Sequence, residues 1–191
     1  EVEIGRGKRG RAAYAFDDIA IVPSRRTRDP EEVSTHWQID AYRFEIPLMA
    51  APMDSVMSPA TAVLLGKLGG LGVLDLEGLW TRYPDPAPLL EEIAGLDDGD
   101  ATRRLQQLYE EPVREELIAS RLREIRDAGV TVAGALSPQR VKRYHEAVLD
   151  AGVDLFVIRG TTVSAEHGSG RAEPLNLKQF IYERDVPVIV G

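Results

Sequence analysis

The sequence contains no cysteine among its 191 residues. Disulfides, thiolate metal sites and a cysteine nucleophile are therefore excluded within these residues. No apolar run approaches the roughly 20 residues that a membrane-spanning helix needs. The N-terminus also lacks the charged start and apolar core of a secretory signal. These absences predict a cytoplasmic protein with no membrane partner.

Basic residues are outnumbered, 23 against 31 acidic ones, and the net charge is −8. Such a surface gives no general reason to bind nucleic acid. The basic segment "GRGKRGR" (5–11) is read as a solvated tail or as a local contact with an anion or a subunit. Hydrophobic residues make up 43% and charged residues 28%, which is typical of a soluble globular domain. The length suits one domain or a large part of one.

Five apolar runs have the length and composition of β-strands. They are rich in Val, Ile and Leu and do not alternate with polar residues, which is typical of parallel strands buried on both faces. The runs cover residues 46–50, 71–76, 130–136, 153–160 and 186–191. We therefore expect an α/β protein with a parallel sheet.

Helical patterns separate these runs. "SPATAVLLGKLGG" (58–70) begins with Ser58 as a plausible N-cap and Pro59 at the first helical position, and it ends in glycine. "SPQRVKRYHEAVLDAG" (137–152) repeats this design, and "EPLNLKQFIYERD" (173–185) supplies a third helix. Strand, helix and strand in this order predict βα units.

One connection, residues 77–129, is much longer than the others. Prolines at 84, 86, 88 and 112 divide it into two or three amphipathic helices. The first interpretation is a helical insertion in the outer layer, with Trp80 and Tyr83 as packing residues. A regulatory or subunit contact is the alternative.

Ligands of α/β proteins bind at the carboxyl ends of the strands, whether the sheet is open or closed into a barrel. Five runs suit a doubly wound sheet or part of a (β/α)₈ barrel. The residues delivered to that edge are Ala51, Pro52, Met53, Asp54, Ser55, Asp75, Glu77, Ser137, Arg159, Gly160, Thr161, Thr162, Ser164 and Gly191.

Two of these residues carry charge that needs a partner. Asp54 either braces its loop or contacts a ligand. Arg159 follows four apolar residues, and a cation there should not be buried unpaired. It is expected to meet Asp54, Asp75 or a ligand phosphate, with donors from Gly160 to Thr162 beside it.

Other chemical signals are weak. "GGLG" (69–72) precedes a strand instead of following one, so we interpret it as a helix C-cap and turn, not as a dinucleotide loop. His36, His145 and His167 have no metal-ligand spacing, and His145 is expected on a helix surface. No metal site is predicted.

Four segments resemble the IMP dehydrogenase and GMP reductase family. "YAFDDIAIVPSRRTRDPEEVST" (14–35) is similar to the family's opening segment, and "PLMAAPMDSV" (47–56) to its first strand and nucleotide loop. "LGGLGVL" (68–74) resembles its second strand, and "AGVDLFVIRGTT" (151–162) its fourth strand and the loop that follows.

The resemblance implies a (β/α)₈ TIM barrel, of which residues 1–191 hold the first five strands as the N-terminal part of one catalytic domain. It implies a substrate site at Ala51, Pro52, Met53, Asp54 and Ser55, with Met53 against the purine and Asp54 bracing the loop. It implies a cofactor site at Arg159, Gly160, Thr161 and Thr162.

The chain departs from the family pattern in four ways. The residue corresponding to Ala51 is often serine in the family. Residues 77–129 stand where many members carry two CBS modules, as in the CBS-less, IMP-dehydrogenase-related branch of actinobacteria and cyanobacteria. Arg159 replaces the usual aspartate that contacts the ribose of NAD, so NADP is the alternative cofactor. The family's nucleophilic cysteine would lie beyond Gly191, so these residues alone are expected to be inactive.

The resulting expectation is an IMP dehydrogenase that converts IMP, NAD and water to XMP and NADH through a covalent cysteine intermediate. The alternatives are an NADPH-dependent GMP reductase, a non-catalytic purine-nucleotide-binding regulator, and an unrelated five-stranded flavodoxin-like module. The resemblance further implies a homo-tetramer or octamer and a monovalent cation such as potassium in the intact protein.

Overall fold

The computed structural model describes residues 2–3, 6–23, 25–160 and 175–191. The described chain consists of two compact units, residues 1–34 and 35–191. The first unit holds a short antiparallel pair, β1 (Val2–Glu3) and β2 (Arg9–Gly10), and two 3₁₀ turns, η1 (Phe16–Asp18) and η2 (Pro30–Glu32). None of the described helices is long and apolar enough to cross a bilayer.

The second unit is built on five parallel strands. They are β5 (Met49–Ala50), β6 (Leu71–Asp75), β7 (Ala133–Leu136), β8 (Leu155–Ile158) and β9 (Val188–Val190). Each strand pairs with the next along the chain, so the sheet order is the sequence order. The flavodoxin-like alternative is wrong, because a doubly wound sheet changes direction at a switch point. The strands form a curled half-barrel, as expected for the first five strands of a (β/α)₈ barrel.

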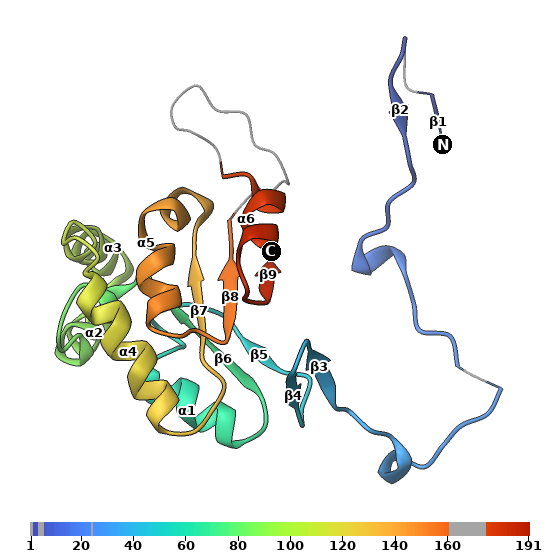
Figure 1. Ribbon diagram of the computed structural model, residues 1–191, viewed down its shortest axis with the longest axis horizontal. Coiled ribbons are helices and arrows are strands. Elements are labelled where there is room, and N and C mark those ends of the chain that lie inside the picture. The colour runs from blue at the N-terminus through green and yellow to red at the C-terminus, as the bar shows by residue number, and fades with distance from the viewer. Residues whose placement is uncertain (1, 4–5, 24, 161–174) are drawn as a thin grey trace. The chain divides into compact units, whose positions relative to one another are not determined.

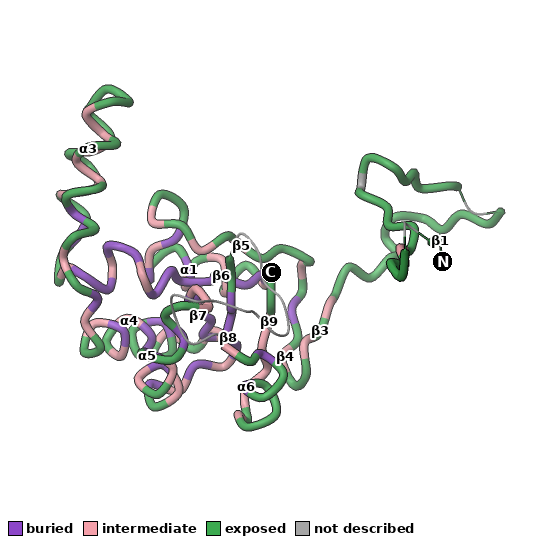
Figure 2. The backbone as a smooth tube through the Cα atoms, turned by 90° about the horizontal axis from the view of Figure 1, so that it is seen from above, coloured by how far each residue is buried: buried purple, intermediate pink, exposed green. Residues whose placement is uncertain are grey.

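All five predicted strands form, with shorter bounds. The first run was expected over 46–50, but only Met49 and Ala50 pair with β6, because the Leu48 N–H turns back to the Ile46 carbonyl at 2.8 Å. β6, β7 and β8 are buried along their whole length, as Figure 2 shows. β5 and β9 are the sheet edges and are partly exposed.

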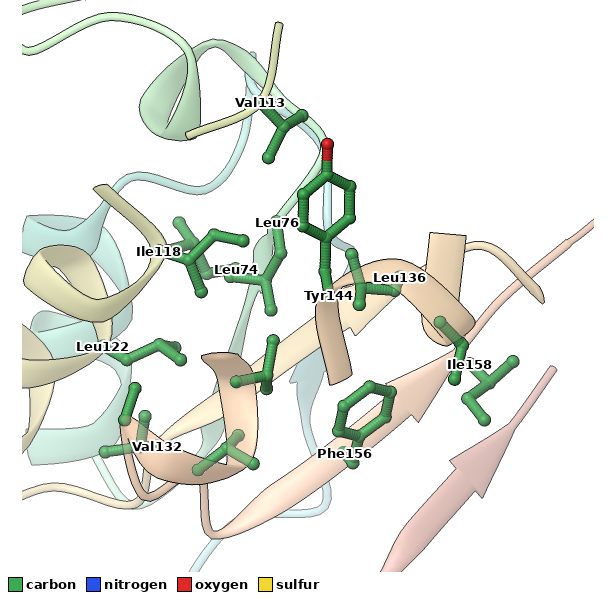
Figure 3. Packing of buried hydrophobic residues seen from close by; sticks show 14 of the residues in the cluster. Leu74, Leu76, Val113, Ile118, Leu122, Val132, Leu136, Tyr144, Phe156 and Ile158 are labelled. Atoms are coloured by element: carbon green, nitrogen blue, oxygen red, sulfur yellow. The ribbon is translucent and has the colours of Figure 1, made fainter. Parts of the chain in front are cut away.

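Four helices cover one face of the sheet: α1 (Pro59–Lys67), α4 (Glu115–Asp127), α5 (Pro138–Asp150) and α6 (Leu177–Glu183) (Figure 1). Their buried side chains pack on Leu74, Leu76, Phe156 and Ile158, which point outward from the strands. Tyr144 of α5 lies between Leu136 and Leu76 in this core (Figure 3).

The other face of the sheet holds a smaller cluster that includes Leu71, Val73, Leu155 and Val157. A β-hairpin, β3 (Trp37–Ile39) and β4 (Tyr42–Phe44), packs on it through Phe44, whose ring stacks on Trp37 with centroids 4.5 Å apart. Burial of both sheet faces explains why the strands read as continuous apolar runs.

The signals at the ends of α1 are confirmed. The Ser58 side chain accepts a hydrogen bond from the Thr61 N–H at 3.0 Å. Gly69 follows the helix with φ = +88°, and the Gly70 N–H returns to the Leu65 carbonyl at 3.0 Å. Glycine is favoured at this left-handed position, which supports the helix C-cap interpretation of "GGLG".

The segment 77–129 divides into parts with different surroundings. It contains the turn η3 (Leu79–Thr81) and helices α2 (Ala87–Ala94), α3 (Asp98–Leu108) and α4. α4 lies between α1 and α5 and belongs to the outer layer of the half-barrel. α2 and α3 pack on each other as a separate hairpin, so only residues 87–108 are additional to a simple βα unit.

Close packing of α1 on β6 depends on Gly72. A Cβ at this position would lie 2.5 Å from the Ala62 Cα, so Gly72→Ala must push the helix away from the strand. We expect a loss of about 1–3 kcal/mol in the free energy of unfolding, measured by urea denaturation. Gly99→Ala in α3 is the control, because a Cβ there meets nothing closer than 3.5 Å and helix propensity favours alanine. Equal stability of the two variants would contradict this packing.

Candidate functional site

The loop after β5 forms a wall of a cavity of about 550 Å³ at the carboxyl edge of the sheet. Pro52, Met53, Asp54 and Ser55 line it. The loop turns because the Met57 N–H bonds the Met53 carbonyl at 2.7 Å, just before the Ser58 cap. Ala51, also predicted here, is exposed and is not among the described residues that line the cavity.

Asp54 connects this loop to two other segments. Its Oδ2 accepts hydrogen bonds from the Leu79 N–H at 2.8 Å and from the Tyr109 hydroxyl. Its Oδ1 is buried against Gly78 and has no hydrogen-bond partner among the described residues. Asp54 therefore braces the loop against η3 and the end of α3, the first of its two predicted roles.

Arg159, at the end of β8, meets Asp75 at the end of β6. A guanidinium nitrogen lies 2.7 Å from Oδ2 of Asp75, and the Glu77 N–H donates to Oδ1 at 2.9 Å. Asp75 was one of the partners predicted for Arg159. The Asp75 side chain is 8% exposed, whereas the Arg159 side chain is 45% exposed and lines the cavity.

Burial raises the pKa of Asp75 from 3.8 to about 6. The hydrogen bond from the Glu77 backbone and the nearby charge of Arg159 both lower this pKa, but by less. Desolvation of the carboxylate therefore outweighs its two partners. The acid changes charge within the range of ordinary assay conditions.

A second cavity, of about 490 Å³, adjoins the first at the same edge. Asp75, Tyr109 and Arg159 line both cavities. Glu77, Arg82, Ser137, Gly160 and Gly191 complete the described lining of the second. The predicted substrate loop and the described part of the predicted cofactor segment therefore lie around two connected spaces.

Several predicted polar groups have structural partners. The Glu77 carboxylate accepts the Ser137 N–H at the start of α5, so Glu77 supports that helix. The Ser137 hydroxyl makes no capping bond. The Gly160 N–H, expected as a free donor, bonds the Gly191 carbonyl at 3.1 Å and joins the ends of β8 and β9.

Thr161, Thr162, Ser164 and His167 lie outside the described residues. The expectation that His145 is a surface residue is wrong: it is half-buried. Its Nδ1 lies 2.9 Å from the Val141 carbonyl, its ring contacts Phe180, and Arg184 donates to Nε2 at 3.1 Å. The Nε2 atom of His36 lies 3.4 Å from the carboxylate of Glu45, and neither residue is among the described lining of the two cavities.

Sequence reasoning missed the contribution of the α2–α3 hairpin to the site. Leu90, Ile93 and Ala94 of α2 and Leu105 of α3 line the first cavity. Tyr109, directly after α3, reaches Asp54. In the sequence, only the apolar stripe of the two helices indicated this role. Such a stripe is the same whether it packs on the protein core or lines a ligand cavity.

Arg82 holds the end of this hairpin in place. Its guanidinium is buried and donates to the carbonyls of Glu77 at 2.9 Å, Tyr109 at 2.9 Å and Glu111. It also lies 4.9 Å from the centre of the Tyr109 ring, a cation–π contact. These contacts fix the Tyr109 side chain from two sides.

Comparison with known proteins agrees with the half-barrel. Residues 13–191 match the model of the IMP dehydrogenase / GMP reductase domain. The chain belongs to this family.

Relatives in this family cover the full chain. Uncharacterized oxidoreductases of Mycobacterium tuberculosis (strain H37Rv) and Mycolicibacterium smegmatis are 49% and 47% identical over all of it. The crystal structure of an IMP dehydrogenase/GMP reductase-like protein from Corynebacterium glutamicum covers 100% of the chain at 45% identity with a TM-score of 0.85. The chain spans about half the length of these proteins: 52% of the two relatives and 51% of the crystallised chain.

The raised pKa of Asp75 predicts a pH dependence of stability. The Asp75 carboxyl takes up its proton at about pH 6 in the folded state and only near pH 4 in the unfolded state. Protonation of Asp75 therefore stabilises the folded state. This contribution to the free energy of unfolding is full below pH 4 and is lost as pH rises through 6. Its size is about 3 kcal/mol. The temperature of the thermal unfolding midpoint of the parent should decrease as pH is raised from 4 to 6.5. In Asp75→Asn this decrease should be absent.

Asp127→Asn, at an exposed position at the end of α4, is the matched control and should keep the parental profile. An unchanged pH profile in Asp75→Asn would show that another group is responsible.

Proposed function

We propose that the natural protein catalyses a redox reaction on the purine ring of a nucleotide, with a nicotinamide dinucleotide as its redox partner. One observation carries this proposal: the loop 52–55 and Arg159 line the same cavity at the carboxyl edge of a half-barrel of this family. Catalytic groups of (β/α)₈ enzymes lie at that edge.

The first cavity has the chemistry that a nucleoside requires. Met53, Pro52 and apolar side chains of α2 and α3 offer surface to a flat base. The carboxylates of Asp54 and Asp75 are hydrogen-bond acceptors, which suit ribose hydroxyls or ring N–H groups. These residues bind and orient the substrate.

The second cavity fits the dinucleotide. Arg159 places an exposed cation between the two spaces, and Arg82 is a second cation in its lining. A dinucleotide carries phosphates that such cations attract. When bound, it would supply the hydride acceptor or donor, while Arg159, held by Asp75, would contact the 2′-phosphate of the phosphorylated form.

The nucleophile of the proposed reaction is not in this chain, which has no cysteine. The first candidate reaction is the oxidation of IMP to XMP with NAD. The second is the reduction of GMP by NADPH. Arg159 favours the second candidate, because an arginine accommodates the 2′-phosphate that distinguishes NADP from NAD.

Both directions can be tested on the protein purified from its natural source. It is incubated with IMP and either NAD or NADP, and with GMP and either NADH or NADPH. XMP and reduced cofactor would establish the dehydrogenase, whereas IMP and ammonia would establish the reductase. Nucleotide binding without turnover in any mixture would contradict the proposal and support a non-catalytic regulator.

Arg159 should discriminate between the two dinucleotides. The test variant combines Arg159→Ala with Asp75→Asn, so that no buried carboxylate is left unpaired. It should raise the KM for the phosphorylated dinucleotide by about 10- to 100-fold, because a charge-assisted hydrogen bond is lost. The KM for the unphosphorylated form should change by less than about threefold. Asp75→Asn alone is the control. Equal effects on both dinucleotides would exclude Arg159 as the discriminating residue.

A further inference from the structure

The α2–α3 hairpin (residues 87–108) has a face that lines the first cavity. Leu90, Ile93 and Leu105 are half-buried, and they share the cavity with Met53 and Pro52 from the loop after β5. The cavity-lining side chains come from both helices of the hairpin and from a loop more than 30 residues earlier in the chain.

Tyr109 connects this hairpin to the loop. Its hydroxyl donates to Asp54, and its backbone carbonyl accepts from Arg82 at 2.9 Å, while its ring lies under the same guanidinium. Burial, and then the hydrogen bond to Asp54, raise the pKa of Tyr109, so the hydroxyl remains protonated and donates at every ordinary pH. The position of Asp54 therefore depends on the residue that directly follows the hairpin.

We propose that the α2–α3 hairpin is a wall of the nucleotide site. The purine base of the mononucleotide binds against Leu90, Ile93, Leu105 and Met53. Tyr109 is the positioning residue that holds Asp54 in this site. This inference rests on the proposed function. It assigns to the hairpin a part in substrate binding that the outer-layer interpretation of the sequence did not give it.

The base fits this cavity better than the phosphate does. Six of the eleven described residues that line it are apolar: Pro52, Met53, Leu90, Ile93, Ala94 and Leu105. The polar part of the described lining includes Asp54 and Asp75, whose carboxylates repel a phosphate and accept N–H or O–H donors. Its one described cation, Arg159, is already paired with Asp75. An uncharged aromatic ring with donor groups at its edge matches both parts.

The test compares two leucines of the same hairpin in the natural protein. Leu105 lines the cavity, whereas Leu96, between the two helices, is 38% exposed and is not among its described lining residues. Leu105→Asp should raise the KM of the mononucleotide substrate at least tenfold and leave the KM of the dinucleotide within about twofold. Leu96→Asp should leave both unchanged.

Folding is controlled separately. Leu105→Met keeps an apolar side chain of similar volume, so it should restore the KM to within about threefold of the parent. The midpoint of urea denaturation is measured for each variant. If Leu105→Asp folds and its KM for the mononucleotide equals the parental value, the hairpin is only an outer-layer insertion and the inference is wrong.

Tyr109→Phe removes only the hydroxyl that holds Asp54. We expect a rise of about three- to tenfold in the KM of the mononucleotide with an unchanged dinucleotide KM. The variant stays folded, with a lowered midpoint of urea denaturation, because a hydrogen bond to a carboxylate is lost. Tyr182→Phe is the control, because Tyr182 is 90% exposed on α6. A parental KM in Tyr109→Phe would overturn the positioning role.

These outcomes separate the inference from the function on which it rests. If the parent protein turns over neither IMP nor GMP, the proposed function fails. If the parent is active and the Leu105 and Tyr109 variants keep its KM, the function stands and only the role of the hairpin fails.

Discussion

Parallel pairing in chain order is the constraint on which the site depends. Because β5 to β9 run side by side in the same direction, the residues that follow them lie along one edge. Loop 52–55, Asp75, Ser137 and Arg159 are far apart in sequence and meet there for this reason. Helices on one face and the β3–β4 hairpin on the other bury both sides of the sheet and hold this edge in place.

Asp54 links that edge to the α2–α3 hairpin. One carboxylate oxygen accepts both the Leu79 N–H and the Tyr109 hydroxyl, so the loop after β5, the turn after β6 and the end of α3 share a single contact point. Hydrogen bonds to a charged acceptor are about twice as strong as neutral ones. Arg82 adds a second connection through carbonyls on both sides of the insertion. The hairpin is therefore fixed to the site by polar contacts.

The strands and the positions of the loop residues could be predicted because buried parallel strands leave a plain pattern of apolar runs with Ser-Pro and glycine at the helix ends. The contribution of the α2–α3 hairpin to the cavity lining could not be predicted from the sequence. An apolar stripe on α2 and α3 looks the same whether it faces a core or a cavity, and the Tyr109–Asp54 contact joins residues 55 positions apart. The Gly160 N–H was mistaken for a ligand donor because its bond to Gly191 continues the pairing of β8 with β9, which joins segments about 30 residues apart.

The Asp75–Arg159 pair joins the ends of two strands that are separated by β7. Asp75 pairs in register with Ala135, and Ala135 with Val157, so β7 separates the strand that ends in the acid from the strand that ends in the base. Ala133 and Ala135 are the β7 members of the cluster on the inner face of the sheet. The ion pair at the carboxyl edge therefore reaches across β7, whose residue in register between the two strands is an alanine.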